Sequence, residues 1–226
     1  MLKESHSLFA DFSLTKLRQF LIALKCNPMN LKGTWHPLGF IIIKLFNSTD
    51  FDYRLHIWPK GLRRPKTPDW PIHNHVFDLE SIVLSGAVGS EAYSISCDES
   101  PEGRYRAYMV KYTSEGSDLV PSSTLMNLRS DGVTWTNQGE KYQVPKGSFH
   151  RSIVNSDVFA ATLVRTSSKS VLDMPIVLGI EDLPQRHACF SNSVDRTFLV
   201  SLIDKISTED LHQTSINSRS TNDCMV

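Results

Sequence analysis

Two histidines separated by a single residue, His73 and His75, have the type and spacing needed to bind a metal ion. Residues two apart on a β-strand point to the same face, so both imidazoles can project to one side. Glu80 follows five residues after His75. On a continuous strand that odd offset would turn the carboxylate to the opposite face. We therefore expect the chain to bend near Asp78 and to bring Glu80 to the two imidazoles.

A third histidine, His150, follows a predicted turn. Pro145 fixes its own φ, and Gly147 accepts the positive φ that a type II turn requires. The turn would place His150 at the start of a new strand, with Ser152 and Val154 on the same face. We expect this imidazole to meet the first two from across a barrel.

Three imidazoles and one carboxylate form a ligand set that suits Fe, Mn, Ni, Cu or Zn. Calcium and magnesium are disfavoured because they prefer oxygen ligands. We predict one divalent transition metal ion, bound by His73, His75, Glu80 and His150 at metal–nitrogen distances of about 2.0–2.2 Å. For any one of these histidines, a place in the core is the alternative. Histidines that lie alone in the sequence are interpreted as surface or hydrogen-bonded side chains: His6, His36, His187 and His212.

Short apolar and β-branched runs between residues 38 and 166 predict the strands that position these side chains. Turn-forming stretches at residues 47–50, 98–103 and 130–132 separate them, with no helical pattern between. This pattern of short apolar runs separated by turns predicts an antiparallel β-sandwich or β-barrel. The expected strands cover residues 39–46, 53–58, 91–97, 104–112, 141–144, 149–154 and 158–165.

The strand expected at residues 53–58 has two different faces. Arg54 and His56 share one face, and the apolar Leu55 and Ile57 share the other. We expect the apolar face to pack inward, which leaves Arg54 and His56 as secondary candidates for substrate contact.

Helices are predicted near both ends of the chain. Four leucines at helical spacing predict an amphipathic helix over residues 14–25, with Ser13 as its cap. Apolar residues at helical spacing predict a second helix over residues 196–206. We divide the chain into an N-terminal helical extension (1–37), a barrel (38–166), a C-terminal extension with a helix (167–213) and a disordered polar tail (214–226).

The composition limits the classes of partner. Lys plus Arg and Asp plus Glu both number 24, so the formal net charge is zero and no electrostatic footprint indicates nucleic acid or a membrane surface. The basic residues at 60–66 are interpreted as a solvated loop. No apolar run approaches the roughly 18 residues of a spanning helix. Without a signal-peptide pattern, the four scattered cysteines are expected to be free thiols in a cytoplasmic protein.

The two histidine segments resemble the two signature motifs of the cupin superfamily. The first family motif is Gly, five residues, His-x-His, three or four residues, Glu, six residues, Gly. The second is Gly, five residues, Pro-x-Gly, two residues, His, three residues, Asn. His73, His75 and Glu80 match the first motif with four intervening residues, and Gly139, Pro145, Gly147 and His150 all match the second.

This chain departs from the cupin pattern at three positions that are not ligands. Thr67 stands in place of the opening Gly, Gly86 arrives one residue early and Asn155 one residue late. The interval between Gly86 and Gly139 is longer than in minimal cupins, so extra strands or a lid are expected there. The resemblance covers about residues 38–165.

The resemblance implies a double-stranded β-helix, or jelly roll, with the metal inside the barrel near its mouth. Cupins include dioxygenases, isomerases, epimerases, decarboxylases, storage proteins and regulators, so the fold does not settle the function. We favour a non-haem oxygenase that uses Fe(II) on a small organic substrate. Mn, Ni, Zn or Cu are alternative metals. A homodimer is one of the assemblies that the sequence leaves open.

Two residues are predicted to take part in catalysis. Glu80 would bind the metal or a metal-bound water, and Arg165, near the end of its strand, could clamp a substrate carboxylate. A surface position is the alternative for Arg165. Two other functions remain open. One is a metal-dependent isomerase, epimerase or lyase in which Glu80 or a neighbour moves protons, and the other is a ligand-binding cupin without turnover.

Two groups of oxygenases differ from the expected ligand set. Thiol dioxygenases resemble this chain in plan and length, but they use three histidines without a carboxylate, so Glu80 counts against that activity. The 2-oxoglutarate oxygenases present His-x-Asp, whereas this chain has His73 and His75 as His-x-His.

Overall fold

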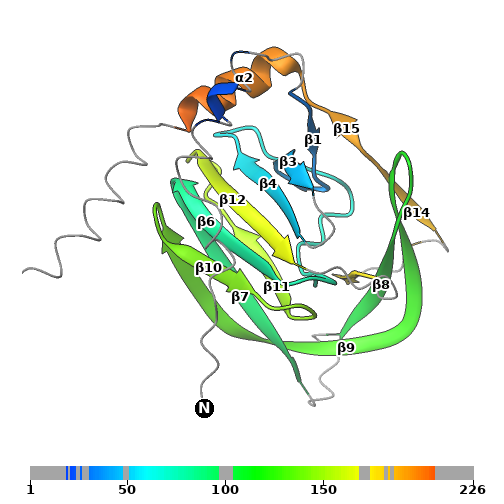
Figure 1. Cartoon of the computed structure of the whole chain (residues 1–226). Coiled ribbons are helices and arrows are strands. Elements are labelled where there is room, and N and C mark those ends of the chain that lie inside the picture. Colours follow the sequence, from blue (N-terminus) through cyan, green and yellow to red (C-terminus); the bar gives the residue numbers. More distant parts are fainter. Residues whose placement is uncertain are drawn as a thin grey trace, which may run out of the picture.

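The computed structural model describes residues 31–47, 51–96, 104–167, 174–180, 183 and 186–206, together with residues 19, 21–23 and 26. Two β-sheets face each other, and a helix lies behind one of them (Figure 1). The strands are β1 Gly33–Trp35, β2 Leu38–Gly39, β3 Ile41–Asn47, β4 Phe51–Trp58, β5 Arg64–Pro65, β6 Leu79–Ser85, β7 Ala87–Ser96, β8 Arg104–Tyr112, β9 Gly116–Asn137, β10 Lys141–Val144, β11 Phe149–Ile153, β12 Ala160–Ser167, β13 Ile176–Gly179, β14 His187–Phe190 and β15 Asn192–Ser193, and the helix is α2 Arg196–Lys205.

The first sheet has seven strands in the order β10-β6-β12-β4-β3-β1-β15. The Val-, Ile- and Leu-rich runs predicted from the sequence form its centre, because such residues pack well on a pleated sheet. Strand β12 pairs antiparallel with β4 along its whole length, from Ala160 opposite Trp58 to Ser167 opposite Phe51. On its other side it pairs with β6.

The second sheet has the order β11-β7-β9-β8-β13, and β14 pairs with β9 as well. Strand β9 is the longest and contacts both β7 and β8. The segment at His73 adds one more bridge beside β11. Figure 1 shows β9 curving beneath the first sheet, so that the two sheets enclose the barrel.

The strand order is that of a jelly roll. The chain runs from β4 in the first sheet to the His73 segment in the second, and then back to β6. It stays in the second sheet from β7 to β9 and then alternates again through β10, β11 and β12. Two interleaved sets, β10-β6-β12-β4 and His73-β11-β7-β9, therefore form a double-stranded β-helix. The predicted mainly β, jelly-roll fold is confirmed.

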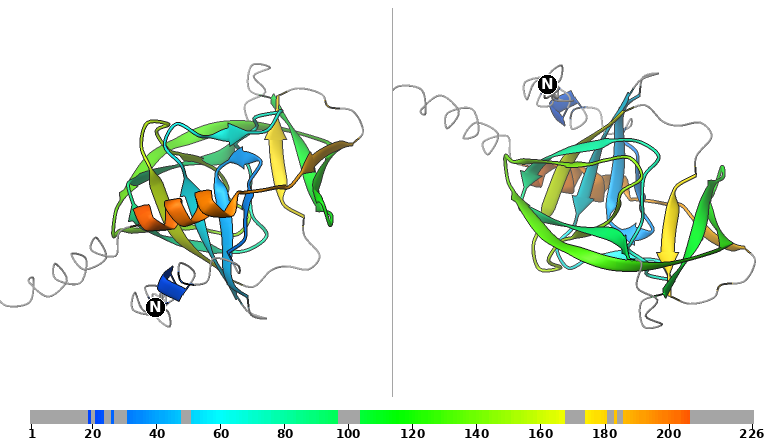
Figure 2. Two further views of the ribbon diagram at one scale, coloured as in Figure 1. Left: turned by 90° about the horizontal axis from the view of Figure 1, so that it is seen from above. Right: turned by 90° about the horizontal axis from the view of Figure 1, so that it is seen from below.

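Both faces of the first sheet are buried. Leu55 and Leu163 pack on its outer face with Leu199 and Leu202 of α2. Figure 2 shows this helix lying across the strands. On the inner face, Val83 packs against Val88 and Val154, which come from the opposite sheet and the end of β11. The apolar face of β4 is therefore in the core as expected, but that core lies between the sheet and α2.

The helices agree with the prediction where the structure describes them. Asp195 caps α2, because its Oδ1 accepts a hydrogen bond from the backbone N–H of Phe198 (3.0 Å). Residues 19, 21–23 and 26 are helical, and Leu21 is buried in the same core as α2. The predicted cap Ser13 and the polar tail at 214–226 lie outside the described residues.

Two sequence expectations differ from the observed strands. The turn expected at residues 130–132 lies inside β9, where the pairing with β7 shifts register between Glu91 and Tyr93. Gly132 adopts a φ of 100° there, which suits a bulge in a continuous strand. Strands also continue after residue 166, as β13, β14 and β15. They extend the sheets beyond the predicted barrel.

Candidate metal centre

Three histidines converge inside the barrel. His73 and His75 come from the segment before β6, and His150 is the second residue of β11. Their potential ligand atoms all lie within 4.8 Å of one another, and in the described part of the chain they form a group that could hold a metal ion. The Nε2 atoms of His75 and His150 are 3.0 Å apart. The two sequence segments predicted to meet do meet, but as neighbours in the second sheet and not from across the barrel.

The turn before His150 holds this arrangement in place. Ser148 N–H donates to the Pro145 carbonyl (3.1 Å), and Gly147 has a φ of 81°, as the sequence predicts. Gly147 N–H also donates to the carbonyl of His75 (2.9 Å). The turn that delivers one histidine therefore binds the backbone of another.

The imidazole rings have fixed orientations. The carbonyl of Pro71 lies 2.8 Å from Nδ1 of His73, so Nδ1–H donates there and Nε2 keeps its lone pair for a ligand role. The Phe77 ring stacks on His75 with centroids 4.9 Å apart and planes 17° apart. The guanidinium of Arg54 lies 5.4 Å from the centroid of Phe77, a cation–π contact that helps to hold that ring.

The three rings are electrically neutral at physiological pH. Burial, followed by the charge of His73, lowers the pKa of His150 to about 3. Burial is also the main cause that lowers the pKa of His75 well below its usual value, and it lowers the pKa of His73. Neutral imidazole is the form that binds metal ions, so the rings do not have to lose a positive charge before an ion binds.

The spacing of the nitrogens fits a metal ion. Two nitrogens bound at about 2.1 Å and at a right angle to one another are roughly 3.0 Å apart. This matches the 3.0 Å between Nε2 of His75 and Nε2 of His150. Ligands of one ion are at most about 4.2 Å apart. The widest pair of the group, within 4.8 Å, therefore needs only a small ring rotation to close on an ion.

Glu80 does not join the histidines. It lies on β6, opposite Arg165 of β12. Side chains alternate along a strand, so Glu80 shares a face with Leu84, which packs in the core beneath α2. Glu80 is buried on that outer face. The expected fourth ligand therefore points away from the barrel interior.

The reason lies in the bend before β6. The chain does leave the strand conformation at residues 76–78, as the odd offset required. After the bend, however, Leu79 faces inward and packs with Phe77, the ring that stacks on His75. The bend therefore turns Leu79, and not Glu80, toward the barrel interior.

Arg165, expected to be catalytic, lies on the same outer face. Its guanidinium is 4.5 Å from the ring centroid of Phe51 and 5.8 Å from that of Tyr53. Tyr53 belongs to the core beneath α2. The structure therefore brings together three of the five predicted site residues, the histidines, and places Glu80 and Arg165 behind the sheet.

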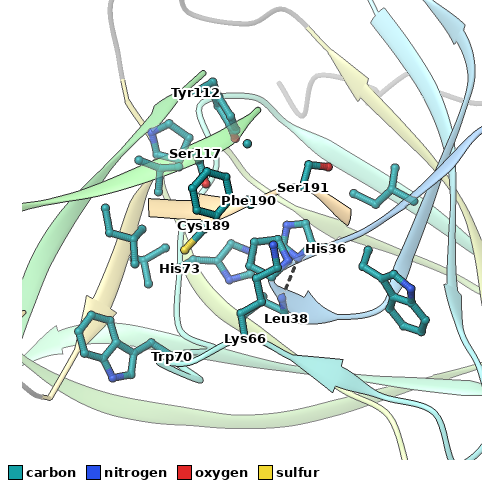
Figure 3. Close-up of a pocket in the computed structure, with 18 of the residues that line it drawn as sticks. His36, Leu38, Lys66, Trp70, His73, Tyr112, Ser117, Cys189, Phe190 and Ser191 are labelled. Atoms are coloured by element: carbon teal, nitrogen blue, oxygen red, sulfur yellow. Dashed lines mark hydrogen bonds between the residues drawn. The ribbon is translucent and has the colours of Figure 1, made fainter. Parts of the chain in front are cut away.

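A cavity of about 260 Å³ adjoins the histidines (Figure 3). His73 and His75 form part of its wall, and most of the remaining wall is apolar, including Trp70, Leu119 and Phe190. Its volume is just below the range of roughly 300–1,000 Å³ typical of small-molecule sites. The cavity therefore gives a small molecule a place beside the candidate metal centre.

The sequence did not indicate two polar residues of this wall, His36 and Lys66. His36 precedes the predicted barrel, and the sequence interpretation makes it a surface or hydrogen-bonded histidine and places Lys66 in a solvated loop. His56 is only a secondary candidate in the sequence, yet its ring contacts Phe40 in a tilted arrangement, with ring centroids 4.9 Å apart. Phe40 in turn stacks on His36 at 4.4 Å. The residues around His36, Trp35 and Pro37, form no helix or strand pattern from which its place in the cavity wall could be predicted.

No family model matches the sequence, and no curated protein matches it. Solved structures do resemble it. A polyketide cyclase, RemF, from Streptomyces resistomycificus is 14% identical over 70% of this chain and 86% of its own, with a TM-score of 0.38. A hydroquinone 1,2-dioxygenase from Sphingomonas sp. TTNP3 with 4-hydroxybenzoate bound is 15% identical over 57% of this chain and 65% of its own, with a TM-score of 0.34.

The DMSP lyase DddQ from Ruegeria pomeroyi DSS-3 is 13% identical over 61% of this chain, with a TM-score of 0.33. The chain spans only 50% of that lyase. Likenesses this distant assign no activity, and the jelly-roll fold is established by the strand order of the chain itself. Among the described helices, none has the length and hydropathy to cross a bilayer.

Proposed function

We propose that this chain is a cupin that binds one divalent transition metal ion, preferably Fe(II), through His73, His75 and His150. We propose further that it acts as a non-haem oxygenase on a small organic substrate in the adjoining cavity. The observation that supports this function is the convergence of three neutral imidazoles beside a partly closed, mostly apolar cavity whose wall includes His73 and His75.

A divalent ion bound by three side chains keeps open positions, where it can supply Lewis acidity and a binding place for O₂ or substrate. The chain supplies the orientation. The Pro71 carbonyl fixes the tautomer of His73, and the Phe77 ring fixes the plane of His75. Apolar side chains of the cavity wall, such as Trp70, limit the access of water to a bound substrate.

An isomerase or lyase that uses a carboxylate base has less support from the cavity lining than an oxygenase. Isomerases and lyases need a side chain that moves protons at the substrate. Glu80, the residue expected to do so, lies behind the sheet. Neither Asp nor Glu occurs among the described residues that line the cavity. His36 does line it, but burial lowers its pKa to about 3, which makes it a poor base at neutral pH.

Because Glu80 does not lie in the site, the comparison with thiol dioxygenases also changes. The carboxylate was the feature of the sequence that separated this chain from enzymes with three histidine ligands. Three neutral imidazoles leave the full double charge of the ion uncompensated, so an anionic substrate would balance it. This charge argument supports an acid, thiol or phenol as the substrate.

The test is metal analysis of the chain, purified without a chelator or a nickel-affinity step. It is followed by anaerobic iron loading and oxygen-electrode traces with small acids, thiols and phenols. We expect about one ion per chain and substrate-dependent oxygen uptake that His75→Ala abolishes. Turnover with zinc or manganese and without oxygen uptake would replace the oxygenase by an isomerase or lyase. Bound metal without turnover across the substrate set would favour a ligand-binding cupin.

A further inference from the structure

We propose that the cavity selects a small carboxylic acid with an apolar or aromatic body, and that Lys66 and His36 bind its carboxylate. The inference rests on the proposed function in one respect, that the cavity is the substrate site. It adds the class of substrate and two binding residues, neither of which is a metal ligand.

The charge of the cavity wall favours an anion. Lys66 is the cationic side chain among the described lining residues, and no carboxylate accompanies it there. The ion pairs found in the described part of the chain do not involve Lys66. An unneutralised ammonium in a partly closed cavity attracts a carboxylate more strongly than it would in water.

Lys66 and His36 belong to one rigid corner of the cavity. The backbone N–H of Lys66 donates to the carbonyl of Pro37 (2.8 Å), which ties the two segments together. The N–H of His36 donates to the carbonyl of Phe40 (2.7 Å), and the His36 ring stacks on the Phe40 ring. Figure 3 shows Lys66 and His36 among the side chains around the cavity. Binding residues held in this way lose little conformational entropy when a ligand arrives.

His36 presents a hydrogen-bond donor to the cavity. Its Nδ1 accepts the N–H of Leu38 (3.2 Å), so the proton of the neutral ring is on Nε2. Burial, with smaller contributions from the charges of His73, Arg54 and Lys66, keeps the pKa of His36 at about 3. The ring therefore stays neutral, and the Nε2–H can donate to a carboxylate oxygen without losing or gaining a proton.

The apolar part of the wall suits an apolar body. Trp70 is 6% exposed and packs on Tyr108, with ring centroids 4.8 Å apart. A Cβ added at Gly179 would lie 2.4 Å from the Trp70 ring, so this glycine leaves the space in which the indole sits. With Leu119 and Phe190, the indole forms a firm apolar surface. A volume of about 260 Å³ is large enough for a single ring or a short chain.

The test compares three probes of nearly the same shape and different charge: phenylacetate, phenylacetamide and 2-phenylethylamine. Their dissociation constants are measured by calorimetry on the full chain, metal-free and then loaded with zinc, which does not react with oxygen. We expect metal-free protein to bind phenylacetate about tenfold more tightly than the amide and the amine to bind most weakly. Equal binding of the acid and the amide would overturn the proposal.

Two pairs of variants assign the effect to the residues. Lys66→Met should weaken phenylacetate binding about tenfold and leave the amide unchanged. Lys60→Met, which removes an exposed lysine of the same loop, should change neither. His36→Asn keeps an N–H donor and should bind phenylacetate better than His36→Phe, which keeps the stacking alone. If Lys66→Met, with an unchanged melting curve, binds both probes like the wild type, Lys66 has no role in binding.

Metal content is measured on the same samples, so the two proposals fail separately. A chain that takes up no metal but discriminates the acid from the amide through Lys66 contradicts the proposed function and supports the carboxylate site. A chain that binds one ion through its histidines but does not discriminate the probes contradicts the carboxylate site alone.

Discussion

His73 and His150 donate backbone hydrogen bonds to each other. The N–H of His73 lies 3.0 Å from the carbonyl of His150, and the N–H of His150 lies 2.9 Å from the carbonyl of His73. The two residues form an antiparallel bridge, so their side chains leave the backbone on the same side. His75 is held to the same frame through Gly147. The backbone therefore sets the positions of all three imidazoles before any ion binds.

Removal of one ligand should therefore abolish metal binding without unfolding the chain. His75→Ala removes an imidazole and leaves the backbone frame intact, because the Gly147 N–H bonds to the main chain of residue 75. We expect metal content to fall to near zero and the circular dichroism spectrum to stay unchanged. Elemental analysis by mass spectrometry measures the first quantity.

His187→Ala is the matched control, because His187 contacts the Thr67 carbonyl (3.0 Å) and is not one of the three clustered histidines. It should keep its full metal content. A His75→Ala protein that unfolds, yet holds metal once it is refolded, would make His75 a core residue and not a ligand.

Gly147→Val should damage folding more than it damages metal affinity in whatever protein remains folded. A Cβ at this position would meet no atom within 4 Å, so the expected effect comes from the backbone. A β-branched residue resists the φ of 81° that the turn requires. We expect the free energy of unfolding to fall by about 1–3 kcal/mol, measured by urea denaturation.

Lys146→Val places the same side chain on the neighbouring residue, where φ is not positive. This control should change stability much less than Gly147→Val. Equal losses in the two variants would mean that the φ of Gly147 is not the cause.

The histidine ligands could be predicted because their signals are local. A spacing of two residues fixes a common strand face for His73 and His75, and Pro145 with Gly147 fixes the turn before His150. The apolar runs likewise predicted most strands of the jelly roll, although β6 and the long β9 were not among the expected strands. In each case the deciding contacts lie within a few residues along the chain.

The remaining features depend on contacts between distant segments. The face on which Glu80 emerges depends on the number of residues in the bend at 76–78, which the sequence does not fix. His36 and Lys66 line the cavity because β2 pairs with β5, Leu38 opposite Pro65. Neither strand is longer than two residues. Strands this short have no periodicity that a sequence pattern could reveal.

The stability of the metal-free chain should fall as the pH falls below neutrality. Burial is the largest cause that lowers the pKa values of His36 and His150 from 6.5 to about 3 in the folded chain. Between pH 6.5 and 3 the unfolded chain therefore binds more protons than the folded chain. Its free energy of unfolding then decreases with falling pH, by up to ~1.4 kcal/mol per pH unit for each such histidine.

Urea denaturation of metal-free protein at pH 7, 6, 5 and 4 measures this slope. His36→Asn replaces one of the two histidines by a side chain that does not titrate, so its slope should be shallower below pH 6. A slope identical to that of the wild type would show that His36 is protonated normally in the folded chain.

Glu80→Gln decides between the ligand set predicted from the sequence and the one seen in the structure. If Glu80 bound the metal, the neutral amide would be a weaker ligand, and oxygen uptake or metal content would fall. The structure instead places Glu80 on the outer face of the sheet with Leu84, opposite Arg165. We therefore expect Glu80→Gln to bind as much iron as the wild type and to keep its substrate-dependent oxygen uptake.

The variant changes a buried carboxylate, so the free energy of unfolding should change while the metal content does not. Elemental analysis and urea denaturation of the same preparation measure both quantities. A loss of iron at unchanged stability would return Glu80 to the coordination sphere and contradict the three-histidine site.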